Sequence, residues 1–181
     1  MKQIIKKKED LKLSWYPFYT KSRFEKKADE SLKKAGYEVF LPLMKKERNW
    51  SDRKKIVEMP LFSSYIFVRI PKYKIYDVLQ IYGIVRYIVF NGRPATVRDS
   101  EIDMIRKVLS NKTEVDVVDG ILEKGAEVTI KSGIFKGYTG KYIESKGKNK
   151  IVIEIESINK TLLVTIEMNS INTDDNKTEN E

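Results

Sequence analysis

The chain has 181 residues, of which 41% are hydrophobic, so it is long enough for one medium domain or two small domains with packed cores. It contains neither Cys nor His, which excludes disulfides, thiol nucleophiles, histidine general bases and ordinary zinc sites. No apolar run reaches the length of a membrane span, and residues 1–13 lack a signal-like apolar region, so we expect a cytoplasmic protein without membrane contact.

The net charge of +9 is distributed unevenly along the chain. Residues 1–110 carry 25 Lys and Arg against 13 Asp and Glu, a net of +12, whereas residues 111–181 carry 10 against 13, a net of −3. All eight Arg lie in the first segment, and Arg suits phosphate and stacked-base contacts better than Lys does. This asymmetry indicates a basic N-terminal domain that meets nucleic acid and a C-terminal domain with a different partner. The alternative is solubility with incidental clustering.

The N-terminal segment predicts an arm, a strand and a helix. Residues 1–13 are Lys-rich without a stable period, which predicts a flexible basic arm. Residues 14–20, SWYPFYT, predict the first strand. Ser22 and Glu25 have the spacing of a capping box, so we expect a helix to begin there and to end at Gly36.

Four more strands and two helices are predicted up to residue 110. They are a strand over 37–44, a basic hairpin tip over 45–55, strands over 56–61 and 62–70, a short helix over 73–82, a strand over 85–90 closed by an Asn91-Gly92 turn, and a helix from Asp99 or Ser100 to Leu109. Residues 62–70 are apolar on both faces, which predicts a strand that is covered on both sides. The order of these elements indicates an α+β sandwich.

The rest of the chain predicts a small all-β domain. Residues 111–120 are rich in charge and turn formers and predict a linker to a domain over 121–171. Alternating apolar residues mark its strands, at 126, 128 and 130, at 151, 153 and 155, and from Leu162 to Met168, with an Asn159-Lys160 turn between the last two. Residues 172–181 are polar and acidic, which predicts a disordered tail.

Glycines punctuate the first part of this domain. In GAEVTIKSGIFKGYTGKY, residues 125–142, Gly133, Gly137 and Gly140 allow positive φ or close backbone approach where the chain reverses. The pattern resembles the KOW motif, which is found in small five-stranded SH3-like barrels of transcription and ribosomal proteins.

Three upstream motifs resemble the NusG family in order. They are WYPFYT at 15–20, PLFSSYIFVRI at 60–70 and GIVRYIVFNGRPATV at 83–97. The resemblance covers residues 14–171 and implies an NGN domain over 14–110, an α/β sandwich with an antiparallel sheet, followed by the KOW barrel. Residues 48–62 are most similar to specialised paralogs of the RfaH and UpxY type. Ser63-Ser64 stands where general NusG proteins usually have Pro-Gly.

The resemblance implies a transcription elongation and antitermination factor without catalytic residues, cofactor or metal, acting as a monomer. Family proteins bind the clamp helices of the RNA polymerase β′ subunit and approach the β subunit, which disfavours pausing and termination. The specialised likeness implies action at particular operons, such as surface polysaccharide clusters. The KOW barrel of the family recruits a ribosomal protein or the Rho terminator. In RfaH the same segment refolds into a helical hairpin, but the strong strand alternation here favours a stable barrel.

The resemblance also implies two sets of contact residues. The matching polymerase face is Tyr19, Phe62, Tyr65, Phe67, Ile88 and Phe90, and their spacing by two, on what we take to be adjacent strands, places each pair on one sheet face. The alternative for each is a core position beneath a helix. The candidates for contact with the non-template DNA strand are Lys21, Arg23, Lys33, Lys34, Tyr82 and Arg86, with Tyr82 stacking on an extruded base. The alternative for each Lys is a solvated helix face. Residues 72–76 match the region that faces the β subunit.

Other functions are weighed on the residues. A general NusG-type elongation factor would act without operon selectivity. A KOW-type ribosome or RNA-binding protein would need basic barrel loops, and Lys146, Lys148 and Lys150 form the only dense basic loop. A metal-dependent nuclease or phosphotransferase would need clustered carboxylates at strand ends, and the sequence shows no such motif.

Overall fold

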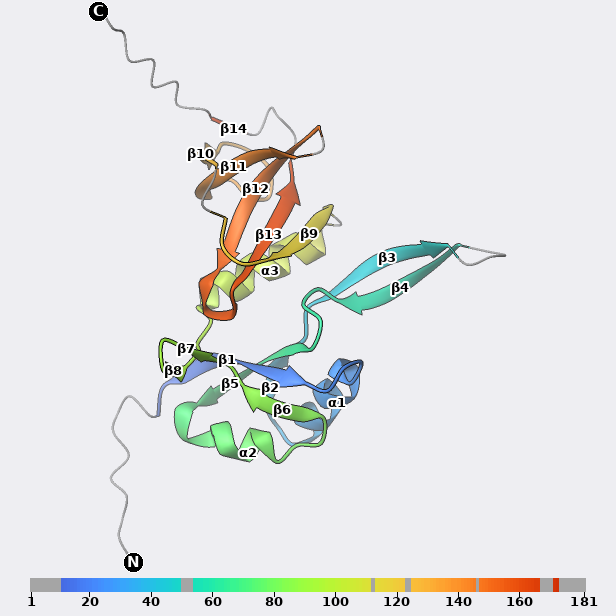
Figure 1. Ribbon diagram of the computed structural model, residues 1–181, viewed down its shortest axis with the longest axis vertical. Helices are drawn as coiled ribbons and strands as arrows, with labels where there is room; N and C mark the ends of the chain where they lie inside the picture. The colour runs from blue at the N-terminus through green and yellow to red at the C-terminus, as the bar shows by residue number, and fades with distance from the viewer. Residues whose placement is uncertain are drawn as a thin grey trace, which may run out of the picture. The chain divides into compact units, whose positions relative to one another are not determined.

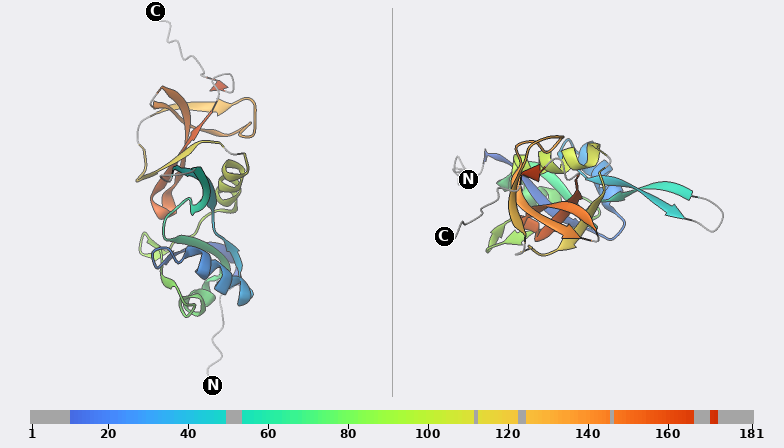
Figure 2. Two further views of the ribbon diagram at one scale, coloured as in Figure 1. Left: turned by 90° about the vertical axis from the view of Figure 1, so that its right-hand side faces the viewer. Right: turned by 90° about the horizontal axis from the view of Figure 1, so that it is seen from above.

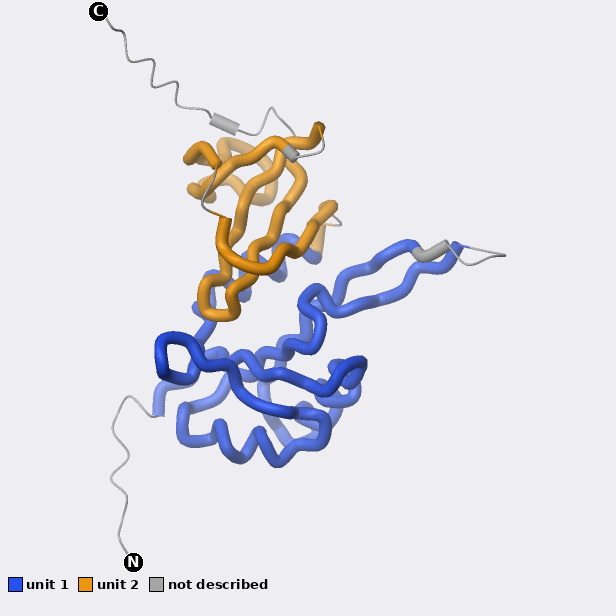
Figure 3. Tube along the Cα trace, viewed as in Figure 1, with its two compact units in different colours: residues 1–109 blue, residues 110–181 orange. Residues whose placement is uncertain are grey.

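The computed structural model describes residues 11–49, 54–111, 113–122, 125–145, 147–166 and 171–172. The chain divides into two compact units, residues 1–109 and 110–181 (Figure 3). The predicted arm lies outside the described residues over 1–10, and the predicted tail over 173–181. Among the helices of the described ranges, none combines the length and apolar character needed to cross a bilayer.

The first unit is built on a four-stranded antiparallel sheet in the order β2-β5-β1-β6 (Figure 1). Two small two-stranded sheets, β3-β4 and β7-β8, accompany it. The elements are β1 (Leu13–Thr20), α1 (Glu25–Lys34), β2 (Glu38–Phe40), β3 (Leu43–Asn49), β4 (Lys54–Pro60), β5 (Tyr65–Pro71), the 3-10 helix η2 (Lys72–Lys74), α2 (Ile75–Leu79), β6 (Ile84–Tyr87), β7 (Val89–Phe90), β8 (Arg93–Pro94) and α3 (Asp99–Ser110).

The core of this unit lies between the sheet and helices α1 and α2. Alternate residues of β1 and β5 point to that face, and Ala28 and Leu32 of α1 and Val78 of α2 meet them. The full buried cluster is Tyr16, Phe18, Ala28, Leu32, Ile66, Val68, Ile70, Ile75, Val78 and Ile84. Because the side chains of a strand alternate, the intervening residues of β1 and β5 face the opposite side of the sheet.

Helix α1 begins differently from the predicted capping box. The residue at its N-cap is Phe24, which makes no side-chain capping bond, and the carboxylate of Glu25 accepts a hydrogen bond from the backbone N–H of Ser64 instead. The capping-box prediction for Ser22 and Glu25 is therefore wrong, because a tertiary partner claims the carboxylate. The predicted stop is confirmed, since Gly36 has φ +83°.

Two predicted strands are interrupted. The strand predicted over 37–44 divides into β2 and β3, and the carbonyl of Pro42 between them accepts from Leu61. The strand predicted over 85–90 divides at Ile88, whose N–H bonds to Pro17 while Val89 and Phe90 pair with β8. The Asn91-Gly92 turn is confirmed, with φ values of +49° and +72° that suit a tight hairpin.

The second unit is an antiparallel sheet of six strands in the order β14-β10-β11-β12-β13-β9. They are β9 (Val115–Asp119), β10 (Ala126–Ile130), β11 (Thr139–Ser145), β12 (Lys148–Ile155), β13 (Lys160–Thr165) and β14 (Ile171–Asn172), with the 3-10 helix η3 (Glu156–Ile158) before β13. The predicted inward residues of the later strands, Ile151, Ile153, Ile155, Leu162 and Val164, are buried, but Val152 and Leu163 between them are buried as well, so both faces are covered there. Met168 lies outside the described residues.

In this unit the sequence prediction was wrong for the segment of β9 and right for the glycines of residues 125–142. Strand β9 occupies residues that the sequence assigns to the linker, because Val115 is buried and β9 pairs along β13. By contrast, the role of glycine in the motif is confirmed: Gly133 and Gly137 have positive φ, and a Cβ at Gly140 would lie 2.7 Å from the Tyr138 ring.

Candidate functional site

Aromatic side chains gather on the face of the first sheet that is turned away from α1 and α2. The rings of Tyr19 and Tyr65 lie 4.5 Å apart between centroids, and their hydroxyls are 2.5 Å apart. Phe67 contacts Phe62 edge-on at 6.0 Å and lies 6.1 Å from Phe40. We call Tyr19, Phe40, Phe62, Tyr65 and Phe67 the aromatic face. Four of the six predicted polymerase-contact residues therefore converge on it.

The members of this set differ in exposure. Phe62, Tyr65 and Phe67 are 1%, 5% and 0% exposed, Tyr19 is half-buried, and Phe90 is 42% exposed. The buried rings stabilise the fold by packing, whereas Tyr19 and Phe90 are accessible enough for a partner to contact. Truncating a buried ring will therefore report stability as well as binding.

The remaining two predicted contact residues lie elsewhere. The expectation that Tyr65 and Phe67 lie on a strand adjacent to that of Ile88 and Phe90 is wrong, because β1 separates β5 from β6. Ile88 sits between β6 and β7, beside Pro17, and Phe90 ends β7. The strand order explains the difference, since the chain crosses the sheet through α2 before returning on the other side of β1.

A basic edge adjoins the aromatic face at the end of β1 and the start of β6. The ammonium of Lys21 lies 4.7 Å from the centre of the Tyr82 ring, and Tyr82, 68% exposed, packs edge-on against Phe24 at 5.6 Å. The guanidinium of Arg86 stacks over Tyr19 at 4.7 Å. An exposed aromatic ring with flanking cations is the arrangement that stacks a base and neutralises its phosphate.

The other predicted DNA contacts are placed as follows. Arg23 is exposed in the turn before α1, with φ +62°. Lys33 and Lys34 lie in the last turn of α1, roughly 13 Å along the helix from its first residue. Lys33 pairs with Asp29 at 2.7 Å. The structure thus brings Lys21, Tyr82 and Arg86 together at one edge, and it does not bring the two helix-end lysines to them.

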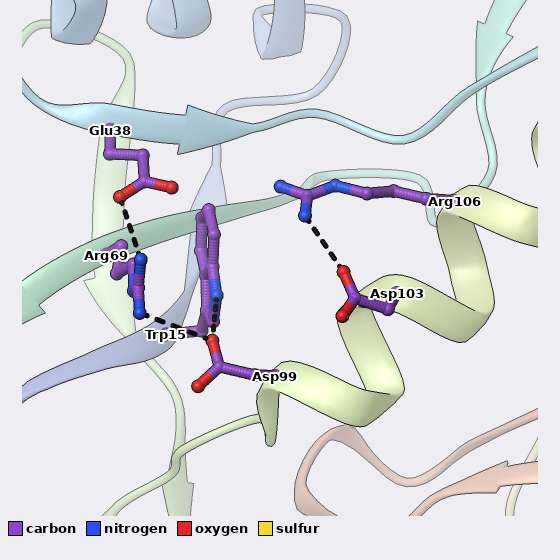
Figure 4. A network of polar contacts seen from close by, with 6 residues as sticks. All are labelled: Trp15, Glu38, Arg69, Asp99, Asp103 and Arg106. Atoms are coloured by element: carbon purple, nitrogen blue, oxygen red, sulfur yellow. Dashed lines mark hydrogen bonds and ion pairs between the residues drawn. The ribbon is translucent and has the colours of Figure 1, made fainter.

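A polar network that sequence reasoning missed ties the aromatic face to α3 (Figure 4). The indole N–H of Trp15 donates to Asp99 at 3.0 Å across 84 residues of sequence, and Arg69 bridges Asp99 and Glu38 at 3.7 and 3.4 Å. Trp15 lies between the guanidinium groups of Arg69 and Arg106, at 6.0 and 5.7 Å from its ring. No local pattern signals these contacts, because the partners come from different elements.

The same network changes the assignment of the α3 cap. The sequence offers Asp99 or Ser100 as the cap, but Asp99 bonds to Trp15, and Glu101 reaches back to the N–H of Arg98 at 2.8 Å. That bond is half of a capping box. Asp99, in the first turn of the helix, also suits the positive end of the helix dipole.

Residues 72–76 border a small cleft of about 270 Å³. Its lining is aromatic, with Tyr76 against Tyr87 at 6.4 Å and edge-on. The lining residues are Lys72, Tyr73, Ile75, Tyr76, Tyr87 and Pro94. The cleft therefore lies at residues 72–76, the segment for which the family resemblance implies contact with the β subunit of the polymerase.

Four lysines of the second unit form ion pairs with carboxylates. Lys148 pairs with Glu114 at 2.5 Å, and Lys150, which is buried, pairs with Asp116 at 2.5 Å. Lys141 pairs with Glu154, and Lys160 with Asp119. The predicted basic loop thus belongs largely to β12, and its charge is balanced by the acidic segment at β9, which leaves little cationic surface there for RNA. Within the described residues no group of three or more acidic side chains has the arrangement of a metal site.

The first unit has an aromatic sheet face beside a cationic edge, and the second unit is a small barrel, so the chain is a two-module protein. The family model described as "Transcription termination factor nusG" matches residues 13–106. The chain belongs to the NusG family, whose members are transcription factors without enzymatic activity that act during elongation.

One solved structure supports the fold. A structure of Thermotoga maritima NusG that concerns its domain interaction is 21% identical, with a TM-score of 0.53, and the match covers 90% of this chain and 97% of that one. The MjSpt4:Spt5 complex is also similar, at 18% identity and a TM-score of 0.27, with 87% of this chain and 96% of that chain covered. No curated protein sequence is similar enough to count as a match. The fold is thus an NGN domain with a KOW barrel.

Proposed function

We propose that the protein is a monomeric, non-catalytic antitermination factor that binds the β′ clamp helices of RNA polymerase and suppresses pausing at particular operons. The observation that carries the proposal is the convergence of Tyr19, Tyr65 and Phe67 on one sheet face beside Arg86. NusG family proteins bind RNA polymerase. A protein that prefers the closed clamp enriches that state by its differential affinity.

The polymerase contact is assigned to the aromatic face with Ile88 and Phe90. Aromatic side chains that are partly accessible and packed by others are the usual hot spots of interfaces. Tyr19 meets this description, because Tyr65 and Arg86 hold its ring on two sides. The cleft at Lys72 to Tyr76 is assigned to the β subunit.

The experiment measures affinity for purified core RNA polymerase with Tyr19→Ala and Phe90→Ala. Each is expected to weaken binding by about 1–3 kcal/mol, as hot-spot truncations do. Ile134→Ala removes a partly exposed apolar side chain from the second unit and is the matched control. Circular dichroism must show each variant folded. Full affinity in the folded double variant Tyr19→Ala/Phe90→Ala would reject the interface.

The basic edge is assigned to the non-template strand. Tyr82 stacks on a base, Lys21 and Arg86 hold phosphates, and Arg23, Lys33 and Lys34 extend the positive surface. Backbone contacts give affinity without sequence preference, so operon selectivity needs base contacts by Tyr82, Arg23 or Arg86, at about 1–3 kcal/mol for each well-read base.

Transcription in vitro on templates with and without the cognate operon leader tests selectivity. Pause suppression is expected on the first template only, and it should be lost in Tyr82→Ala. Equal suppression on both templates would identify a general elongation factor of the NusG type.

The barrel is assigned to recruitment of a ribosomal protein or Rho. Its cleft of about 520 Å³ beside Ile130, Ile134 and Phe135 is the concave surface that we assign to this partner.

A further inference from the structure

The two faces of the β3–β4 ribbon carry different charge. Residues opposite each other in an antiparallel pair share a face, and the register pairs Lys46 with Val57 and Arg48 with Lys55. These two pairs, with Met44 opposite Met59, make up one face, which contains three cationic residues and no acidic residue. The other face contains Lys45 opposite Glu58, Glu47 opposite Ile56, and Lys54 opposite Asn49, and its charges cancel.

Ion pairs follow the same division. On the balanced face Lys54 pairs with Glu47 at 3.0 Å, and Glu58 pairs with Lys26 of α1 at 3.6 Å. On the cationic face Lys46 and Lys55 are exposed, and neither makes an ion pair with any residue that the structure describes. The positive charge of this face is therefore not neutralised within the described part of the chain.

The cationic face is unfavourable for the hairpin itself. Arg48 lies directly opposite Lys55, and like charges at directly opposed positions destabilise a strand pair. The ribbon projects from the sheet of its own unit in Figure 1 and in the right-hand view of Figure 2, so the face is not built to cover that sheet. A partner that supplies negative charge accounts for both observations.

We propose that the cationic face of the β3–β4 ribbon binds the phosphate backbone of duplex DNA, as a second nucleic-acid contact in addition to the basic edge. The proposal deepens the proposed function, because it adds a duplex contact to a factor that follows the non-template strand. The major groove of B-form DNA admits a two-stranded ribbon, whereas the deep, narrow major groove of A-form RNA does not. Successive residues on one face of a strand are about 7 Å apart, a spacing that lets neighbouring cations reach separate phosphates.

Affinity of the full chain for a short DNA duplex, measured by fluorescence anisotropy without polymerase, tests the proposal. Two double variants remove the same charge: Lys46→Gln/Lys55→Gln from the cationic face and Lys45→Gln/Lys54→Gln from the balanced face. The first is expected to bind about tenfold more weakly and to reduce the slope of log K against log salt by about 1.8, as two lost phosphate contacts require. The second should change both quantities much less.

Equal losses in the two double variants would mean that net charge alone governs binding, and they would overturn the assignment to one face. No loss in the first variant would also overturn it. Binding to an RNA duplex of the same length as strong as binding to DNA would overturn the choice of B-form DNA. Affinity for polymerase alone should be unchanged in both variants, so failure here is distinguishable from failure of the polymerase interface.

Discussion

The backbone N–H of Ser64 donates a hydrogen bond of 2.8 Å to the carboxylate of Glu25, which joins the first turn of α1 to the turn before β5. Glu25 is 6% exposed, and Ser64 has φ +63°. The buried Glu25 carboxylate thus accepts a hydrogen bond from the Ser64 N–H, a backbone donor that is not paired within a strand or helix. This bond fixes how α1 sits beside the turn that presents Phe62 and Tyr65.

Glu25→Ala should lower the free energy of unfolding by about 2 kcal/mol, because it leaves the Ser64 N–H without its charged acceptor. Glu25→Gln retains an oxygen acceptor and should lose less. The exposed Glu30→Ala on the same helix is the control. Urea unfolding followed by circular dichroism provides the measurement. A loss as small as that of the control would show that the bond contributes nothing.

Ser64→Gly should leave stability unchanged or raise it by up to about 1 kcal/mol, because glycine adopts φ near +60° without the steric cost that a side chain incurs. Ser64→Val should lower it, since a β-branched residue is strongly disfavoured there. The midpoints of chemical unfolding decide the order. If valine were tolerated as well as glycine, the left-handed conformation would carry no strain.

Asp99→Ala should lower the stability of the first unit by about 1 kcal/mol, because the buried indole N–H of Trp15 loses its acceptor while the carboxylate itself is largely exposed. Asp99→Asn retains an acceptor oxygen and should be milder. Asp103→Ala, an exposed change on the same helix that also removes an ion pair, is the control. Thermal unfolding is the measurement, and equal effects of Asp99→Ala and Asp103→Ala would deny the Trp15 contact any role.

The barrel should lose stability in alkali through Tyr138. Burial raises the pKa of the Tyr138 phenol above its usual 10.0, and the nearby Glu154 carboxylate raises that pKa further. Above pH 10 the unfolded chain therefore binds fewer protons at this group than the folded chain, and the free energy of unfolding falls as pH rises toward the folded pKa.

Tyr138→Phe tests that contribution. The variant should have a flatter stability profile between neutral pH and pH 11, with a loss of about 1 kcal/mol at neutral pH for the hydrogen bond to the Val152 carbonyl. Tyr76→Phe, which changes an exposed ring of the other unit, is the control. An alkaline slope identical to that of the parent protein would contradict the prediction.

The two halves of the chain should fold and act separately. Residues 1–110 alone should retain polymerase binding. A fragment of residues 111–181 should fold as a β-barrel, and a fragment of residues 120–181 should be markedly less stable, because it lacks β9 and uncovers Leu162 and Val164 on β13. Far-UV circular dichroism and thermal unfolding compare the fragments. A helical spectrum for residues 111–181 would favour an RfaH-like change of fold.

Local sequence was sufficient where neighbouring residues alone fix the backbone. The Asn91-Gly92 turn, the stop at Gly36 and the turns at Gly133 and Gly137 follow from the freedom of these residues to adopt positive φ. The alternation of apolar residues also predicted the barrel strands, since at least one face of each strand must be buried. The alternation along β5 also placed Tyr65 and Phe67 on one face.

Long-range pairing decided the rest. The order β5-β1-β6, the recruitment of residues 115–119 into the barrel as β9, and the bonds of Glu25 to Ser64 and of Asp99 to Trp15 each join segments far apart in sequence. A carboxylate near a helix start has the same local signature whether it caps that helix or bonds to a distant group. The sequence by itself determined the family, the two-domain layout and the charge asymmetry. Only the tertiary structure decided which aromatic rings are buried and which cations share a face, because both depend on which strands become neighbours.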